Sequence, residues 1–374
     1  MGERDRRWNT IRALMETGSL DLLVVPSETD TRYLTQAAYD IGPTIIPLRD
    51  EVTLLSDTGL VAPAAQDWVT DIRQVGRRWA DGIVARLNEL NANGKIIGVV
   101  GLDTSTAHPD GDLNYNTFIW MREAFPRTRW VGATTLMQEV RAIKSAEEIA
   151  VLERAAASTD AGLLAAVSAL GAGVRDREVW AQMTLGAVRA GGDPPRHAVV
   201  GLAPMSAGHP PPGPLGRAAE RGDLLMAGLR GSVAGYEAGG TQLATVGPLP
   251  GEWQDAWQVH VDAWGRILEV LVPGQSVIDL EIAARAAATD RYAVRLEILG
   301  AGLGEDLPCF PPQRNDRGRP EPTVLAPNMA LTLRPWVEWD GPNGRLQLTW
   351  SDTILATDGP PRRLGSRPHD SAER

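Results

Sequence analysis

His209 is the side chain of this sequence best suited to moving protons near neutral pH. It lies in the loop 201–210, whose other residues are mainly Gly, Ala and Pro, so it does not belong to the apolar face of a helix. An imidazole with a pKa of about 6.5 can act both as general acid and as general base. Core packing is less natural in such a loop, although a lone histidine is usually a surface or structural residue.

The single cysteine, Cys309, could act as a nucleophile if His209 or Arg334 lowered the pKa of its thiol. A cysteine of the buried type is more often inert, and both interpretations stay open. The remaining histidines carry less signal. We interpret His197 as structural and the other three as surface residues: His108, His260 and His369.

Three short apolar runs in the first third of the chain, at residues 22–25, 52–55 and 96–101, have the length and composition of buried strands. The segments between them are long enough for helical crossovers. Strands that alternate with helices in this way predict an α/β domain over residues 1–138.

A long amphipathic helix is expected to open the second part of the chain. Ser145 and Glu148 fit a capping box, and apolar residues recur at helical spacing from 149 to 170. Further helices and five strand candidates follow. From Gly359 onward the chain is rich in Pro, Arg and Asp, so residues 361–374 are predicted to be a flexible tail.

The overall composition limits the partners. The 374 residues include 37 Lys and Arg against 47 Asp and Glu, a formal charge of −10, which argues against coating nucleic acid or anionic membranes. No stretch approaches the roughly 18 apolar residues of a membrane span, and no secretory signal is visible. One cysteine suits a reducing compartment, so we expect a cytoplasmic protein.

The segment 235–241, Gly-Tyr-Glu-Ala-Gly-Gly-Thr, resembles the metal-binding strand motif Gly-Tyr-x-x-Asp-x-Thr of the creatinase/prolidase/aminopeptidase P ("pita-bread") family. Other motifs of that family follow its order along nearly the whole chain: Arg-Tyr-Leu-Thr at 32–35, Arg-x-Ile-Lys-Ser-x-Glu-Glu-Ile at 141–149, Gly-Asp-Leu at 222–224, Pro-Gly at 273–274, Gly-x-Gly-x-Gly at 300–304, Pro-x-Met at 327–329 and Asp-Thr at 352–353. The resemblance implies an α/β creatinase-like N-terminal domain followed by an α+β pita-bread domain over residues 139–360.

Metal-dependent members of this family bind two divalent ions through two Asp, one His and two Glu, and a metal-bound hydroxide attacks the peptide carbonyl. Carried over by motif, those five positions hold residues that cannot reproduce such a site: Gly228, Gly239, Ala301, Arg334 and Ser351. The resemblance therefore implies a member without metal, and we expect no other cofactor. It also places His209 at the position of the histidine that does acid–base work in creatinase, which needs no metal.

Arg334 is expected on a central strand that faces the pocket. A buried arginine needs an anionic partner. That partner is either a protein carboxylate, with Glu237, Glu338 and Asp352 as candidates, or the carboxylate of a substrate. Other candidate substrate contacts are Ser351, Cys309, Glu237, Trp350 and Trp336, although the two tryptophans could equally pack strands against helices.

Two functions remain open at this point. The first is a metal-independent enzyme that acts on a small, anionic, amino-acid-derived substrate by C–N hydrolysis, elimination, cyclisation or isomerisation, with His209 as general acid/base. The alternative is a pseudoenzyme that binds a peptide or protein partner in the old peptide groove without turnover. By resemblance to creatinase we also expect a homodimer.

Overall fold

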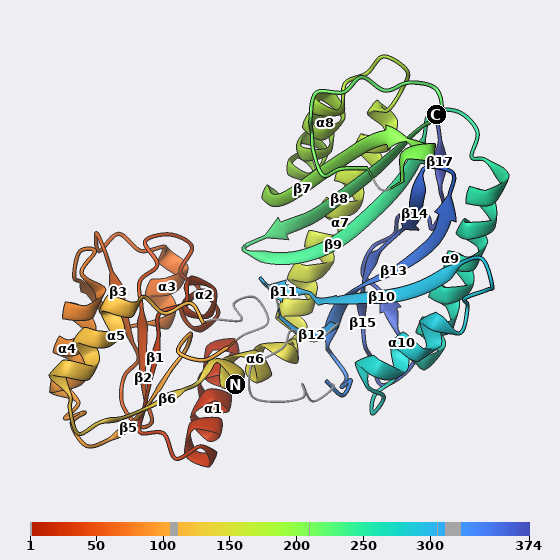
Figure 1. Ribbon diagram of the computed structural model, residues 1–374. Coiled ribbons are helices and arrows are strands. Elements are labelled where there is room, and N and C mark those ends of the chain that lie inside the picture. Colours follow the sequence, from red (N-terminus) through yellow and green to blue (C-terminus); the bar gives the residue numbers. More distant parts are fainter. Residues whose placement is uncertain (1, 105–110, 209, 305, 311–322) are drawn as a thin grey trace. The chain divides into compact units, whose positions relative to one another are not determined.

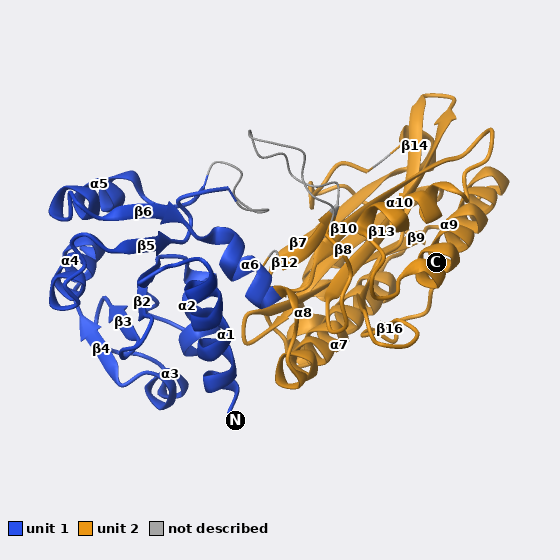
Figure 2. Ribbon diagram, turned by 90° about the horizontal axis from the view of Figure 1, so that it is seen from below, with its two compact units in different colours: residues 1–141, 314–319 blue, residues 142–313, 320–374 orange. Residues whose placement is uncertain are grey.

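The computed structural model describes residues 2–104, 111–208, 210–304, 306–310 and 323–374. The chain divides into two compact units, one up to Arg141 and the other from Ala142 onward (Figure 2). Among the described residues, no helix is long and apolar enough to cross a membrane.

The N-terminal unit is built on one six-stranded sheet with the strand order β4-β3-β2-β1-β5-β6. Its strands are β1 (Leu22–Val25), β2 (Thr44–Pro47), β3 (Thr53–Ser56), β4 (Asp71–Gln74), β5 (Ile96–Val99) and β6 (Arg129–Gly132). Its helices are α1 (Glu3–Thr17), α2 (Glu28–Thr35), α3 (Pro63–Trp68), α4 (Trp79–Glu89), α5 (Tyr115–Ala124) and α6 (Thr134–Ala142), the last of which ends at the boundary of the unit. β1 pairs parallel with β5 and antiparallel with β2, so the sheet is mixed, and its central strands are apolar on both faces because helices cover them.

The C-terminal unit begins with two helices and a sheet that they cover. The helices are α7 (Ala146–Ala169), which starts with the predicted Ser145–Glu148 capping box, and α8 (Asp176–Arg189). The sheet has the order β11-β9-β8-β7, with β17 alongside β9. Its strands are β7 (Asp193–Pro204), β8 (Asp223–Val233), β9 (Tyr236–Thr245), β11 (Gly302–Leu303) and β17 (Ala372–Glu373), and the short 3₁₀ helix η1 (Met205–Ala207) follows β7.

A second sheet completes this unit. Its order is β12-β10-β13-β15-β16, and β14 also pairs with β13. The strands are β10 (Ala293–Gly300), β12 (Asp306–Phe310), β13 (Ala330–Gly341), β14 (Gly344–Thr349), β15 (Asp352–Leu355) and β16 (Arg362–Arg363). Helices α9 (Gly251–Val270) and α10 (Val277–Arg285) pack on it through a large apolar core.

Figure 1 shows α7 and α8 on one side of the C-terminal unit and α9 on the other, with the two sheets between them. The sheets meet where Thr241 of β9 and Ser351 exchange backbone hydrogen bonds, N–H to C=O in both directions. At this junction the inner faces of β8, β9 and β13 lie close together, and a site can form between them.

The end of the chain is not the flexible tail predicted from its composition. β16 pairs with β15, and β17 runs parallel to β9. Arg367 is 1% exposed, and its guanidinium donates to the backbone carbonyls of Ser351 and Thr241 and lies 3.4 Å from Asp160. Arg367, one of the charged residues that suggested a solvated tail, is here a partner in a buried ion pair, which composition alone does not reveal.

Candidate functional site

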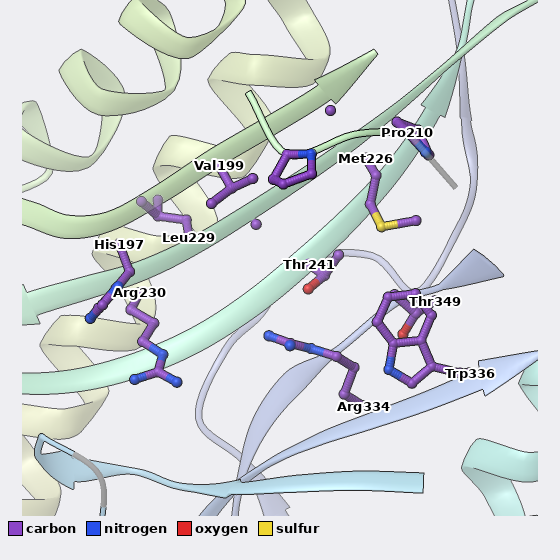
Figure 3. A pocket seen from close by; sticks show the side chains of 13 residues that line it. His197, Val199, Pro210, Met226, Leu229, Arg230, Thr241, Arg334, Trp336 and Thr349 are labelled. Carbon is purple, nitrogen blue, oxygen red and sulfur yellow. The ribbon is translucent and has the colours of Figure 1, made fainter. Parts of the chain in front are cut away.

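A cavity of about 280 Å³ lies between the two sheets of the C-terminal unit (Figure 3). The described residues around it are mainly apolar, with two arginines, two threonines and one histidine, and none is Asp or Glu. They are His197, Val199, Gly201, Pro210, Pro212, Met226, Gly228, Leu229, Arg230, Thr241, Arg334, Trp336 and Thr349.

Strand register explains why these residues share one face. Apart from Leu229, the lining positions on β7 and β8 are two residues apart, and side chains of a strand alternate between faces with that period. The cross-strand pairs are His197 with Arg230, Val199 with Gly228 and Gly201 with Met226. On the other side of β8, β9 places Thr241 opposite Gly228 and Gly239 opposite Arg230. The cavity floor is therefore an ordered patch of three adjacent strands.

The two glycines of this patch have different surroundings. A Cβ atom added at Gly228 would have no other heavy atom within 4 Å, so this position opens into the cavity. A Cβ added at Gly239 would lie 3.0 Å from the Thr332 hydroxyl oxygen and 3.3 Å from its methyl carbon. The space beside Gly239 is filled by the chain itself, whereas the space beside Gly228 is available to a ligand.

A cluster of hydroxyl groups occupies the junction between β9 and β15. The Thr353 hydroxyl donates to the Gly239 carbonyl at 3.0 Å, accepts from the Gly239 N–H at 2.9 Å and contacts the Thr332 hydroxyl at 3.0 Å. Next to it, the Ser351 hydroxyl donates to that of Thr241 at 2.9 Å. Ser351 is fully buried and does not line the cavity, so the structure does not place it where the predicted contact with a substrate would require.

Arg334 lines the cavity, but none of the three carboxylates predicted as its partner holds it. Glu338 pairs with Arg295 and Arg345, Asp352 with Arg363, and Glu237 lies 3.8 Å from Arg230. The partner of Arg334 is Glu297, at 3.2 Å.

Glu297 is the direct cross-strand neighbour of Arg334 on β10. Its carboxylate also accepts a hydrogen bond from the Trp336 indole N–H at 3.3 Å. The Nε atom of Arg334 is buried and has no hydrogen-bond partner among the described residues. One carboxylate therefore serves two residues of the cavity wall and leaves part of the Arg334 guanidinium unsatisfied.

The other predicted substrate contacts divide into one that lines the cavity and three that do not. Trp336 lines it. Trp350 is fully buried in the core, where its ring packs against Trp264 and His369. Glu237, 9% exposed, lies 3.8 Å from Arg230 and does not line the cavity. Cys309, partly exposed on β12, is also absent from the lining.

The histidines correct several expectations from sequence. His209, the predicted acid–base residue, lies outside the described residues. His260 is fully buried rather than on the surface: its Nε2 atom lies 3.1 Å from the Trp350 carbonyl, and burial, with His369 nearby, lowers its pKa to about 3. His369 packs among Trp257, Trp264 and Trp350, and burial lowers its pKa to about 4, with two nearby arginines adding to the effect.

Sequence reasoning missed three polar groups of the cavity: His197, Arg230 and Thr349. Arg230 follows Gly228 by two residues on a strand, so period-two alternation could have placed it on the same face. The places of His197 and Thr349 in the cavity wall depend on which strands are neighbours, and no local sequence pattern shows that.

The comparisons with known proteins agree with this architecture. Residues 7–143 match the creatinase/prolidase N-terminal domain, and residues 150–358, more than half of the chain, match metallopeptidase family M24. The chain belongs to metallopeptidase family M24. The family inferred from sequence motifs is thereby confirmed.

Relatives of this M24 protein include dipeptidases. It is 25% identical over 269 residues to an Xaa-Pro dipeptidase of Pyrococcus furiosus, a match that covers 70% of this chain and 74% of that protein. It is 24% identical over 245 residues to a probable dipeptidase PepE of Mycobacterium tuberculosis, covering 64% of this chain and 63% of that protein.

Solved structures confirm the predicted fold. An Xaa-Pro dipeptidase from Bacillus anthracis superposes with a TM-score of 0.82 at 20% identity, covering 99% of this chain and 100% of that one. A prolidase from Pyrococcus horikoshii superposes with a TM-score of 0.78 at 20% identity, covering 97% and 99%. The M24 protein thus has the creatinase-type N-terminal domain followed by the pita-bread domain.

The family name implies a metal centre, so the donor set must be tested. Within the described part of the chain, no three His, Cys, Asp or Glu side chains lie close enough together to hold a metal ion. The polar groups that line the cavity are two guanidiniums, two hydroxyls and one imidazole. Divalent ions of such sites take carboxylate and imidazole ligands, so these residues do not fit a dinuclear centre.

Proposed function

We propose that this M24 protein acts on a small, anionic, amino-acid-derived molecule without the dinuclear metal centre of its metallopeptidase relatives. One observation carries the proposal: Arg334, a permanent cation, lines the cavity at the position that motif matching assigns to a metal-binding glutamate. A guanidinium repels metal ions and attracts carboxylates, so this single difference reverses what the site can hold.

The other four positions support the same conclusion. Gly228, Gly239 and Ala301 have no side-chain ligand atom, and the Ser351 hydroxyl donates a hydrogen bond to that of Thr241. Gly239 is also closely packed against Thr332, so a ligating side chain there would displace its neighbour. In place of the metal ligands the site has hydroxyl groups, and these positions offer no set of side chains that could hold the metal ions of the relatives.

The reaction class rests on the resemblance to creatinase. His209 would serve as general acid/base in cleaving a C–N bond, or in a related elimination, cyclisation or isomerisation, while Arg334 holds the negative charge of the substrate. The described residues contribute binding and exclusion of water through the apolar wall of the cavity. We further propose that the protein works as a homodimer, as creatinase does.

A second function has an observation of its own in its favour. Because Glu297 already neutralises part of the Arg334 charge, the site can exist without an anionic ligand. A pseudoenzyme that binds a peptide or protein partner in this groove would need no more than that. The two functions differ in whether a small molecule is turned over.

Two measurements on the purified protein test the main proposal. Elemental analysis for zinc, manganese, iron and cobalt should find no stoichiometric metal, and chelation should leave the melting temperature unchanged. Amino acids and small carboxylates should raise the melting temperature of the wild type but not that of Arg334→Gln. Stoichiometric tightly bound metal, or equal ligand stabilisation in both proteins, would refute the proposal.

A further inference from the structure

The floor of the cavity has a notch at Gly228. This residue pairs with Val199 of β7 on one side and with Thr241 of β9 on the other, and all three line the cavity. Met226 and Arg230, two residues away along β8, lie on the same face of that strand. Gly228 therefore has neighbours with side chains on all four sides and no side chain of its own. The space above it, between these four residues, is the notch.

The notch is open space that the packing of the chain does not fill. A Cβ atom added at Gly228 would have no heavy atom of the described residues within 4 Å, whereas one added at Gly239 would lie 3.0 Å from Thr332. Val199, beside the notch, is 41% exposed although it lies between the sheets. Protein interiors are close-packed, and covering aliphatic surface is favourable. An open position next to uncovered aliphatic surface is therefore suited to an apolar group of a ligand.

The facing sheet supplies the group that would hold an acid. Figure 3 shows the side chains of Arg334 and Trp336 on one side of the cavity and those of Val199 and Met226 on the other. A ligand whose carboxylate is bound by Arg334 therefore extends towards the notch with the rest of its atoms. The cavity volume of about 280 Å³ lies at the lower end of the range for small-molecule sites, about 300–1,000 Å³. The space thus suits a short ligand with an acid at one end and an apolar group at the other.

We propose that the notch at Gly228 receives the aliphatic side chain of a ligand whose carboxylate is held by Arg334. This inference rests on the proposed function and adds the substrate class: an amino acid with a short aliphatic side chain, or a close derivative. Gly228 is the specificity-determining residue, because the room above its Cα atom sets the length of the side chain that fits. A larger residue at this position would fill the notch with protein and leave less of it to the ligand.

The test measures how affinity depends on the length of the ligand side chain. L-Alanine, L-α-aminobutyrate, L-norvaline and L-norleucine each add one methylene to the one before. Their dissociation constants are measured by thermal-shift titration of wild type, Gly228→Ala, Gly228→Val and Arg334→Gln. Gly265→Ala is the matched control, because it makes the same chemical change on α9, outside the cavity lining, where an added Cβ also has no heavy atom of the described residues within 4 Å.

Burial of a methylene contributes about 0.8 kcal/mol, so wild type and Gly265→Ala should gain about fourfold in affinity with each added methylene until the notch is full. The gain should end about one carbon earlier in Gly228→Ala and about two carbons earlier in Gly228→Val, since the new side chain takes that part of the notch. L-Alanine should bind these four proteins within about twofold of one another. A general defect in a variant would weaken all probes alike, so the dependence on length separates the two causes. Arg334→Gln should weaken every probe.

The outcomes separate the two proposals. If binding of these acids depends on Arg334 but not on the length of their side chain, the inference about Gly228 is wrong and the proposed function stands. The same dependence on length in wild type and in both Gly228 variants also overturns the inference. If the wild type binds none of these probes at millimolar concentration, both proposals fail.

Discussion

Replacing Thr353 by Val tests whether hydroxyl groups hold the two sheets together at the site. The change keeps the shape of the side chain and removes one oxygen atom. That oxygen donates to the Gly239 carbonyl, accepts from the Gly239 N–H and contacts the Thr332 hydroxyl, all between 2.9 and 3.0 Å, in a fully buried position. Two backbone groups and one hydroxyl thus lose their partner together.

A buried polar group left without a partner costs about 1–3 kcal/mol. Two backbone groups are affected, and local rearrangement recovers part of the loss, so we expect Thr353→Val to lower the free energy of unfolding by about 2–4 kcal/mol. The assay is urea denaturation followed by tryptophan fluorescence, with the transition of the C-terminal unit fitted separately because a two-unit chain need not unfold in one step.

Thr353→Ser is the matched control for this prediction. It keeps the oxygen and deletes one methyl group, which costs about 1 kcal/mol on its own. The reasoning is refuted if the valine variant is as stable as wild type, or if the serine variant is the less stable of the two. In that case the hydroxyl cluster merely fills space.

Three further predictions use the same denaturation assay. Gly228→Ala should change stability by less than about 0.5 kcal/mol because the added Cβ meets open space. Gly239→Ala should cost about 1–3 kcal/mol because the added Cβ is crowded by a buried threonine. Equal effects of the two substitutions would contradict this difference in packing. His260 and His369 have pKa values lowered to about 3 and about 4 from an ordinary 6.5, so the unfolded state binds more protons below pH 6.5. The free energy of unfolding should therefore be at its full value above pH 6.5 and fall progressively as the pH drops towards 4. An unchanged denaturation midpoint between pH 7 and pH 5 would exclude this. Arg367→Met should cost about 3–5 kcal/mol because it leaves a buried carboxylate without its ion pair, and a cost near zero would restore the flexible-tail prediction.

The fold could be predicted from sequence because its signals are local and ordered. The Ser145–Glu148 capping box, the helix after it and the glycine motifs around 235–241 are each short patterns, and they occur in the order of a known family. The same order fixed the positions to be compared with metal ligands. None of this required knowing which strands are neighbours.

The partner of Arg334 shows why the site could be predicted only in part. Glu297 and Arg334 face each other because β10 and β13 pair in one particular register. Register depends on how two distant segments are packed, and the sequence around either residue does not state it. Each of the three carboxylates proposed instead has another partner in the structure.

The prediction for the chain end was wrong for a related reason. Charged residues from 361 onward suggested solvent, but Arg367 is buried because Asp160 and two backbone carbonyls lie within its reach. For Trp350 both a pocket wall and the packed core were open from sequence, and the structure places it in the core. Local composition describes the average environment of a residue type and cannot show when distant partners reverse it.

The carboxylate of Glu297, shared between the Arg334 guanidinium and the Trp336 indole, gives the site an optical signal of its own. An acid that binds Arg334 competes with Glu297, and any movement of that carboxylate changes the charge beside the indole nitrogen. Indole emission shifts with nearby charge, so ligand titrations can be followed as a difference spectrum of the unlabelled protein. A Trp336→Phe variant identifies the source, since it keeps the aromatic wall and removes the reporting nitrogen.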